Sequence, residues 1–302
     1  MKLGLLFASA ILAAGNVFGG MTVTEENDML YGSDDNYTQG LEFRWWGERK
    51  TVRDKGRTWT LALRNLIYTP TDITNSQPQP GDRPWAGLTA ASYGELEAEN
   101  GVLTMWDAML GAVGDWAASD FFQTEWHRIT NNRLPRGWDN DIPNEPVANV
   151  QLLRSWELVG RQAGNVKWLA VEAGGLADVG TAFDDAAAFC QAQVGLNPPS
   201  CRGLGVIGPK DLGGWSAYLF GGGMAKAVLH NVMLGGSLWQ DGPSQDMEWL
   251  VCDLWWGACV SKDVLGFGLS ATFTGSYRTK EFRGQGEDQE WGSLKLGFGR
   301  AF

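Results

Sequence analysis

The segment VLGFGLSATFTGSY, residues 264–277, alternates between two kinds of side chain. In an extended strand, one side would carry Leu265, Phe267, Leu269, Ala271 and Phe273. Small or polar residues would face the other side. The last segment, SLKLGFGRAF (residues 293–302), repeats this pattern and ends on an aromatic residue. Apolar residues facing out and small or polar residues facing in, over about ten residues, are typical of a lipid-facing strand of a membrane barrel.

The same period recurs along the chain and predicts twelve strands. We expect them near residues 20–28, 38–48, 56–66, 85–97, 101–112, 148–160, 165–177, 184–196, 214–228, 246–258, 264–278 and 289–302. Bacterial barrels have an even number of strands. The sequence therefore predicts an all-β protein, a twelve-stranded antiparallel transmembrane β-barrel.

Composition supports a barrel and an exported chain. Sixteen Trp, thirteen Phe and forty-one Gly suit a barrel with aromatic girdles. The net charge of −11 argues against a nucleic-acid partner. A short basic start and an apolar stretch predict a signal peptide over residues 1–20, with the barrel spanning 21–302; the alternative for the start is a buried N-terminal helix. We expect a monomer in the bacterial outer membrane.

Topology places the connections. If both termini lie at the periplasmic end, the connections that follow odd-numbered strands face outward. These are residues 29–37, 67–84, 113–147, 178–183, 229–245 and 279–288. Within the longest of them, residues 115–132 can form a short extracellular helix, a lid over the rim. The stretch 197–213 is longer than a periplasmic turn should be.

Four cysteines occur, at positions 190, 201, 252 and 259. In an exported chain they allow three disulfide connectivities, of which sequential pairing is the simplest. Unpaired buried thiols are the alternative.

The stretch EENDMLYGSDDNYTQG, residues 25–40, is rich in oxygen acceptors. Asn27 and Asp28 form a pair of hard oxygen ligands of the kind that Ca²⁺ selects. Asp and Asn also simply make turns between strands, which explains Gly32–Asn36 well. No EF-hand spacing is present.

His127, in the longest outward connection, is a candidate general base because imidazole accepts a proton near neutral pH. A structural hydrogen-bonding role is the alternative, and His230 is the rival histidine. The sequence has no GxSxG nucleophile elbow. Arg83, Arg128 and Lys280 lie in outward connections, where they could contact lipid phosphates or be solvated loop charges.

Several of these segments together resemble the outer-membrane lipid A 3′-O-deacylase family. The matching segments, in chain order, are residues 25–40, YTPTD at 68–72, DRPWAG at 82–87, EWHRI at 125–129 with RGWDNDIPNEP at 136–146, LHN at 229–231 and TKEFRGQ at 279–285. The resemblance spans nearly the whole mature chain. It implies a twelve-stranded barrel whose site lies between the barrel wall and an extracellular helix.

The resemblance also implies an activity, the Ca²⁺-dependent hydrolysis of the 3′-linked acyloxyacyl chain of lipid A. The family's Asn–Asp pair corresponds to Asn27 and Asp28, its Thr to Thr38 and its His to His127. A Glu expected six residues after that His is Arg133 in this chain, so the missing carboxylate is expected from Asp139, Asp141 or Glu145, or it is absent.

A mechanism follows as a hypothesis. Asp28, with Asn27 or Glu145, holds Ca²⁺, and His127 activates a water molecule that attacks the ester. Thr38 orients His127 or the water, and Arg83, Arg128 and Lys280 contact the lipopolysaccharide. The alternatives are a non-catalytic barrel of the same family, which binds lipid A or has a structural role, a phospholipase with a Ser nucleophile, and a soluble β-sandwich.

Overall fold

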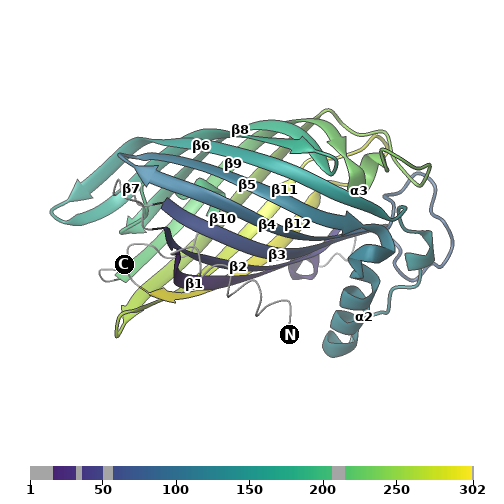
Figure 1. Cartoon of the computed structure of the whole chain (residues 1–302), viewed down its shortest axis with the longest axis horizontal. Coiled ribbons are helices and arrows are strands. Elements are labelled where there is room, and N and C mark those ends of the chain that lie inside the picture. The colour runs from purple at the N-terminus through teal and green to yellow at the C-terminus, as the bar shows by residue number, and fades with distance from the viewer. Residues whose placement is uncertain (1–15, 32–35, 50–56, 206–214, 301–302) are drawn as a thin grey trace.

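The computed structural model describes residues 16–31, 36–49, 57–205 and 215–300. Its strands are β1 (Asn16–Asn27), β2 (Asn36–Arg49), β3 (Arg57–Thr69), β4 (Ala86–Glu99), β5 (Val102–Val113), β6 (Glu145–Ala163), β7 (Val166–Gly180), β8 (Phe183–Leu196), β9 (Trp215–Asn231), β10 (Leu250–Val264), β11 (Phe267–Arg278) and β12 (Gln289–Arg300). Each strand pairs with the next in antiparallel register, and β1 pairs with β12. The twelve-stranded closed barrel is therefore confirmed (Figure 1).

The helical elements are short. They are η1 (Asp28–Tyr31), η2 (Gly114–Ala117), α2 (Ser119–Thr130), η3 (Trp138–Asn140), η4 (Gly203–Gly205) and α3 (Val232–Gly235). Figure 1 shows α2 and α3 at one end of the barrel, with α2 beside the wall. The predicted helix within residues 115–132 is thus confirmed. Among the described helices, none has the length and apolar character needed to cross a membrane.

The strands form because their side chains alternate between two environments. Outward-facing Leu269, Leu296 and Phe298 leave about half of their surface exposed on the wall. Many inward-facing residues are polar, and several are paired: Arg64 donates to Glu42 at 2.9 Å, and Arg278 donates to Asp253 at 2.6 and 3.0 Å. Apolar-out and polar-in alternation is the arrangement that a lipid surface selects.

The connection after β8 enters the barrel interior, whereas an ordinary turn would stay at the end of the barrel. Its first part folds back into the barrel, where Arg202 donates its backbone N–H to Glu172 at 2.7 Å and Lys295 donates to the carbonyl of Gly205 at 2.6 Å. Leu204 packs against an interior apolar cluster that includes Leu96. The unexpected length of the segment 197–213 is explained, over its described part, by an interior plug.

The structure corrects the expected disulfide pairing and leaves the expected signal peptide untested. All four cysteines are free thiols, so the sequential disulfide pairing is not formed. β1 begins at Asn16, inside the segment expected to be a signal peptide. The signal peptide itself remains a prediction, because residues 1–15 lie outside the described ranges.

Candidate active site

The rim end of strands β1 to β3 presents polar side chains on the outer surface of the wall. Arg64 and Tyr68 line the interior cavity, so Asn65 and Thr69 lie on the opposite face of β3. Glu26 accepts a hydrogen bond from Tyr37, whose ring centroid lies 5.0 Å from that of Tyr68. Glu26 therefore faces inward, and Asn27, the next residue along β1, faces outward.

Helix α2 covers this outer polar surface. Asn65 donates from Nδ2 to Oγ of Ser119 at 2.9 Å, and Thr89 donates to the carbonyl of Ala117 at 2.7 Å. Gly87 allows this close approach, since an added Cβ would lie 2.4 Å from the Cβ of Ser119. The start of α2 and the preceding η2 thus pack on the outer wall, where the family resemblance led us to expect the site.

His127 lies on the covered face of α2. Ser119, Gln123 and His127 follow each other at intervals of four residues, and all three are buried. His127 is 1% exposed, and its Nδ1 lies 2.5 Å from the carbonyl oxygen of Arg133. A carbonyl oxygen only accepts, so Nδ1 carries the proton in the neutral ring. Nε2 is then the basic nitrogen, as a general base requires.

Asn27 and Asp28 lie where β1 ends and η1 begins. Asn27 accepts the backbone N–H of Met29 at its Oδ1 at 2.9 Å, which turns the chain, and Asp28 is 1% exposed. Asn132, just after α2, donates from Nδ2 to the sulfur of Met29 at 3.0 Å. This contact brings the end of the His127 helix and the Asn27–Asp28 turn to the same part of the rim.

Thr38 is also at the rim and is buried. Its hydroxyl lies 2.6 Å from the hydroxyl of Thr69, and either oxygen can donate. The register of β2 shifts between Tyr37 and Gln39, which turns Thr38 toward outward-facing Thr69. The hydrogen bond that the structure gives to Thr38 therefore joins two strands of the wall.

Glu145 is on the other side of the wall. It is the first residue of β6 and shares a face with Asn149 and Gln151, which line the interior cavity. Its side chain is 0% exposed, and within the described part of the chain both carboxylate oxygens lack a hydrogen-bond partner. The structure does not bring Glu145 to Asn27 and Asp28.

The three candidate phosphate contacts differ in exposure. Arg83 is 0% exposed, donates to Glu281 at 2.8 Å and lies 4.2 Å from the ring centroid of Tyr68. Burial would raise the pKa of Glu281, but Arg83 and Arg278 outweigh it and lower that pKa to about 2. Arg128 and Lys280 are exposed. Only these last two are accessible to a ligand from solvent.

The candidate residues at this rim offer oxygen donors. A carboxylate, the Asn27 amide oxygen and two Thr hydroxyls at this rim match the chemistry that Ca²⁺ prefers. Over the described ranges, however, no group of three or more His, Cys, Asp or Glu side chains is arranged to hold a metal ion. The oxygen atoms of Asp28, Asn27 and the two Thr hydroxyls are of the type that Ca²⁺ binds, and Asp28 supplies the one carboxylate among these four residues.

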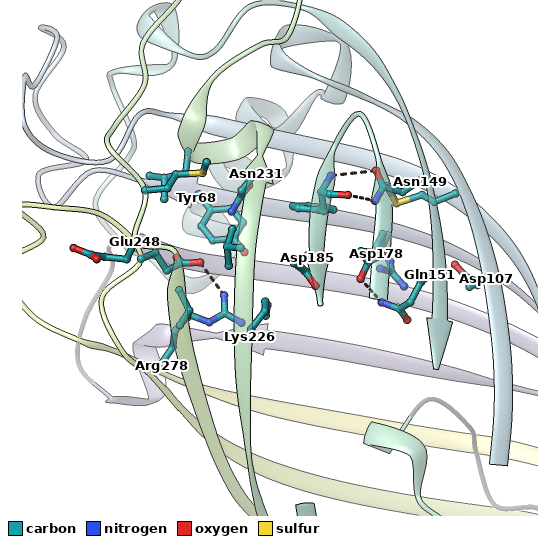
Figure 2. Close-up of a pocket in the computed structure, with 18 residues that line it drawn as sticks. Tyr68, Asp107, Asn149, Gln151, Asp178, Asp185, Lys226, Asn231, Glu248 and Arg278 are labelled. Carbon is teal, nitrogen blue, oxygen red and sulfur yellow. Dashed lines mark hydrogen bonds and ion pairs between the residues drawn. The ribbon is translucent and has the colours of Figure 1, made fainter. Parts of the chain in front are cut away.

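A second polar region, an interior cavity of about 200 Å³, was not expected from the sequence. Figure 2 shows Asp178, Asp185 and Lys226 directed into it from neighbouring strands. Asp178 is the lateral partner of Asp185 and accepts a hydrogen bond from Gln151 at 2.8 Å. The sequence feature that could have indicated this cavity is the set of polar residues at inward positions of the predicted strands. This cavity is separated from His127 by the barrel wall.

The fold and the rim geometry define a class of protein, an outer-membrane β-barrel with a buried histidine on a helix at its rim. Comparison with protein families gives a match over residues 3–299 to the model of "Outer membrane protein LpxR". The chain belongs to this family, which confirms the resemblance seen in the sequence and the location in the outer membrane.

Solved structures agree with the fold. LpxR from Salmonella typhimurium matches with a TM-score of 0.76 and 19% identity, covering 94% of this chain and 100% of that one. The β domain of the Bordetella autotransporter BrkA matches with a TM-score of 0.51 and 10% identity, covering 96% of this chain and 100% of that one. At these identities the likeness shows the fold alone. A comparison with curated proteins gives no match.

Proposed function

We propose that the protein is a carboxylic ester hydrolase that removes the 3′-linked acyloxyacyl chain of lipid A. The observation that carries this proposal is the buried His127, held by Arg133 in the tautomer with a basic Nε2, at the same rim as Asn27 and Asp28. Membership of the LpxR family supports the substrate. Asn27 and Thr69 are on the outward face of their strands, and a site built there would be open to lipopolysaccharide of the outer leaflet.

His127 moves the proton. Its Nε2 removes a proton from water while the water oxygen attacks the ester carbonyl carbon. When the bond to the sugar oxygen breaks, the imidazolium returns the proton to that oxygen. The helix and the wall together limit the access of bulk water, which strengthens electrostatic interactions in the site. No acyl-enzyme is required.

Asp28 would hold a Ca²⁺ ion with Asn27. Bound there, the ion would polarise the ester carbonyl and stabilise negative charge on its oxygen. Thr38 would position the water or the substrate beside Asn27. Arg128 and Lys280, the exposed cations, would contact lipid phosphates as point charges or forks. Contact with buried Arg83 would require the rim connections to move. We expect the barrel to act as a monomer.

One observation favours a second candidate, a non-catalytic barrel that binds lipid A or has a structural role. Position 133 carries an Arg where a carboxylate is expected, and the described residues provide no multi-carboxylate metal group. The two functions are separated by incubating the purified barrel and lipid A with Ca²⁺ or with EDTA. The hydrolase predicts a Ca²⁺-dependent loss of the 3′ acyloxyacyl mass. The second candidate predicts intact lipid A in both samples.

The decisive variant is His127→Gln. Loss of a general base should reduce hydrolysis by about 10²- to 10⁴-fold. Heat-resistant migration of the folded barrel on gels should be unchanged, because α2 lies outside the strand pairing. His230→Gln is the matched control, since His230 lies 3.2 Å from the carbonyl of Thr181 at a different part of the rim. Full activity of the His127 variant would reject the mechanism.

A further inference from the structure

A shallow apolar groove crosses the outer wall over strands β10, β11, β12 and β1. Its side chains follow the lateral pairing of the strands. One row runs from Lys262 through Leu269 and Phe298 to Met21. Ala271 and Leu296 lie in the adjacent row, two residues farther from the β10–β11 turn. Ala271 contributes the smallest outward side chain and leaves the groove open at its centre.

Lys262 marks one end of the groove. Its Nζ lies 4.5 Å from the ring centroid of Trp215, and across the described ranges no carboxylate forms an ion pair with it. The rings of Phe267 and Phe298 stack at 5.4 Å near the same end of the barrel. Exposed aromatic residues of this kind mark a membrane–water interface.

This end of the barrel is opposite α2 and the long rim connections. In bacterial barrels the long connections face outside and the short turns face the periplasm. Lys262 is therefore at the level of the periplasmic leaflet, whose lipids are separate from the proposed substrate. Four neighbouring strands span three lateral spacings, about 14 Å. Because the strands of a membrane barrel tilt by about 35–45°, this row runs obliquely across the wall from the level of Lys262.

We infer that the groove binds one anionic glycerophospholipid of the periplasmic leaflet. An acyl chain lies along Leu269, Phe298 and Leu296, and the head-group phosphate meets Lys262. A second copy of the barrel fits less well. A two-fold interface is self-complementary, so it would bring a second Lys262 to this surface without a carboxylate partner. A phosphate supplies the missing negative charge.

Native mass spectrometry of the purified full-length barrel tests this site. The barrel is titrated in detergent with phosphatidylglycerol or with phosphatidylcholine. The wild type should retain one phosphatidylglycerol about fivefold more tightly than phosphatidylcholine, the effect of one cation at a membrane surface. Lys262→Gln should remove this preference, and Ala271→Phe should weaken the retention of both lipids.

Arg161→Gln is the control, because Arg161 is an exposed cation at the same end of the barrel but outside the groove. It should bind as the wild type does. Lys262→Gln changes a surface side chain and keeps the test valid if Ala271→Phe fails to fold. Unchanged lipid preference in Lys262→Gln would overturn the inference. A dimer that Ala271→Phe disrupts would overturn it in favour of a second copy.

Discussion

The Nδ1 atom of His127 lies 2.5 Å from the backbone carbonyl oxygen of Arg133. The contact holds the ring while the Arg133 side chain remains exposed. Residue 133 can therefore orient the imidazole whatever its side chain, because the interaction uses the main chain. Its side chain sets the charge at this point of the connection, and in this chain that charge is positive.

If the proposed calcium site exists, Arg133→Glu should strengthen calcium binding. It would add a carboxylate to the residue whose carbonyl contacts His127, and Ca²⁺ affinity rises with the charge of the ligand set. We expect the dissociation constant measured by isothermal titration calorimetry to fall by about tenfold. Arg136→Glu is the control, because Arg136 is an exposed residue of the same connection and its substitution changes the charge by the same amount. Equal affinity in both variants would show that residue 133 does not face the metal site.

Gly87→Ala should loosen α2 from the wall. The new methyl group would lie 2.4 Å from the Cβ of Ser119, so the helix must shift. Trypsin should then cleave at Arg128 faster, and the proposed hydrolysis of lipid A should become slower. Gly221→Ala is the matched control, because an added Cβ there meets nothing nearer than 3.5 Å. Wild-type protease resistance in Gly87→Ala would contradict the docking of α2 on this surface.

Substitutions at Thr38 and at its hydrogen-bond partner Thr69 can distinguish a structural from a catalytic role of Thr38. Either Thr38→Val or Thr69→Val leaves a buried hydroxyl without its partner, at a cost of about 1–3 kcal/mol in the free energy of unfolding. The double variant should cost less than the sum, as measured by urea unfolding in lipid vesicles. If Thr38 serves the reaction, activity stays low in Thr38→Val and in the double variant, whereas Thr69→Val retains it. Equal activity losses in both single variants would assign Thr38 to structure.

The barrel was predictable because strand alternation is a local consequence of facing lipid. Twelve strands, and the rim positions of Asn27, Thr38 and His127, follow from counting periods and connections. The residue at which a strand begins is harder to predict from the sequence than the existence of the strand. β6 was expected from residue 148 and begins at Glu145. That difference places Glu145 on the inward face of a strand instead of in a rim connection.

Long-range pairing could not be predicted from the sequence. Arg83 and Glu281 are 198 residues apart, and nothing local to either residue identifies the partner. An arginine in an outward connection was therefore expected to be solvated or to bind phosphate, whereas it is buried under Tyr68. The interior plug after β8 is similar, because its partners Glu172 and Lys295 lie on two strands, β7 and β12, that are far apart in the sequence.

Asp141 should make the rim connection sensitive to pH. Burial, followed by the charges of Asp115 and Asp120, raises the pKa of this carboxyl from 3.8 to about 7. An acid whose folded-state pKa is raised contributes fully to stability below its unfolded pKa. The contribution is lost as the pH rises toward 7. Hydrogen exchange in residues 136–144 should therefore be slower at pH 5 than at pH 8, after correction for intrinsic exchange.

Asp141→Asn should remove most of this difference, while Asp139→Asn, a substitution of an exposed neighbour, should retain it. The same pH difference in Asp141→Asn as in the wild type would assign the effect to another group.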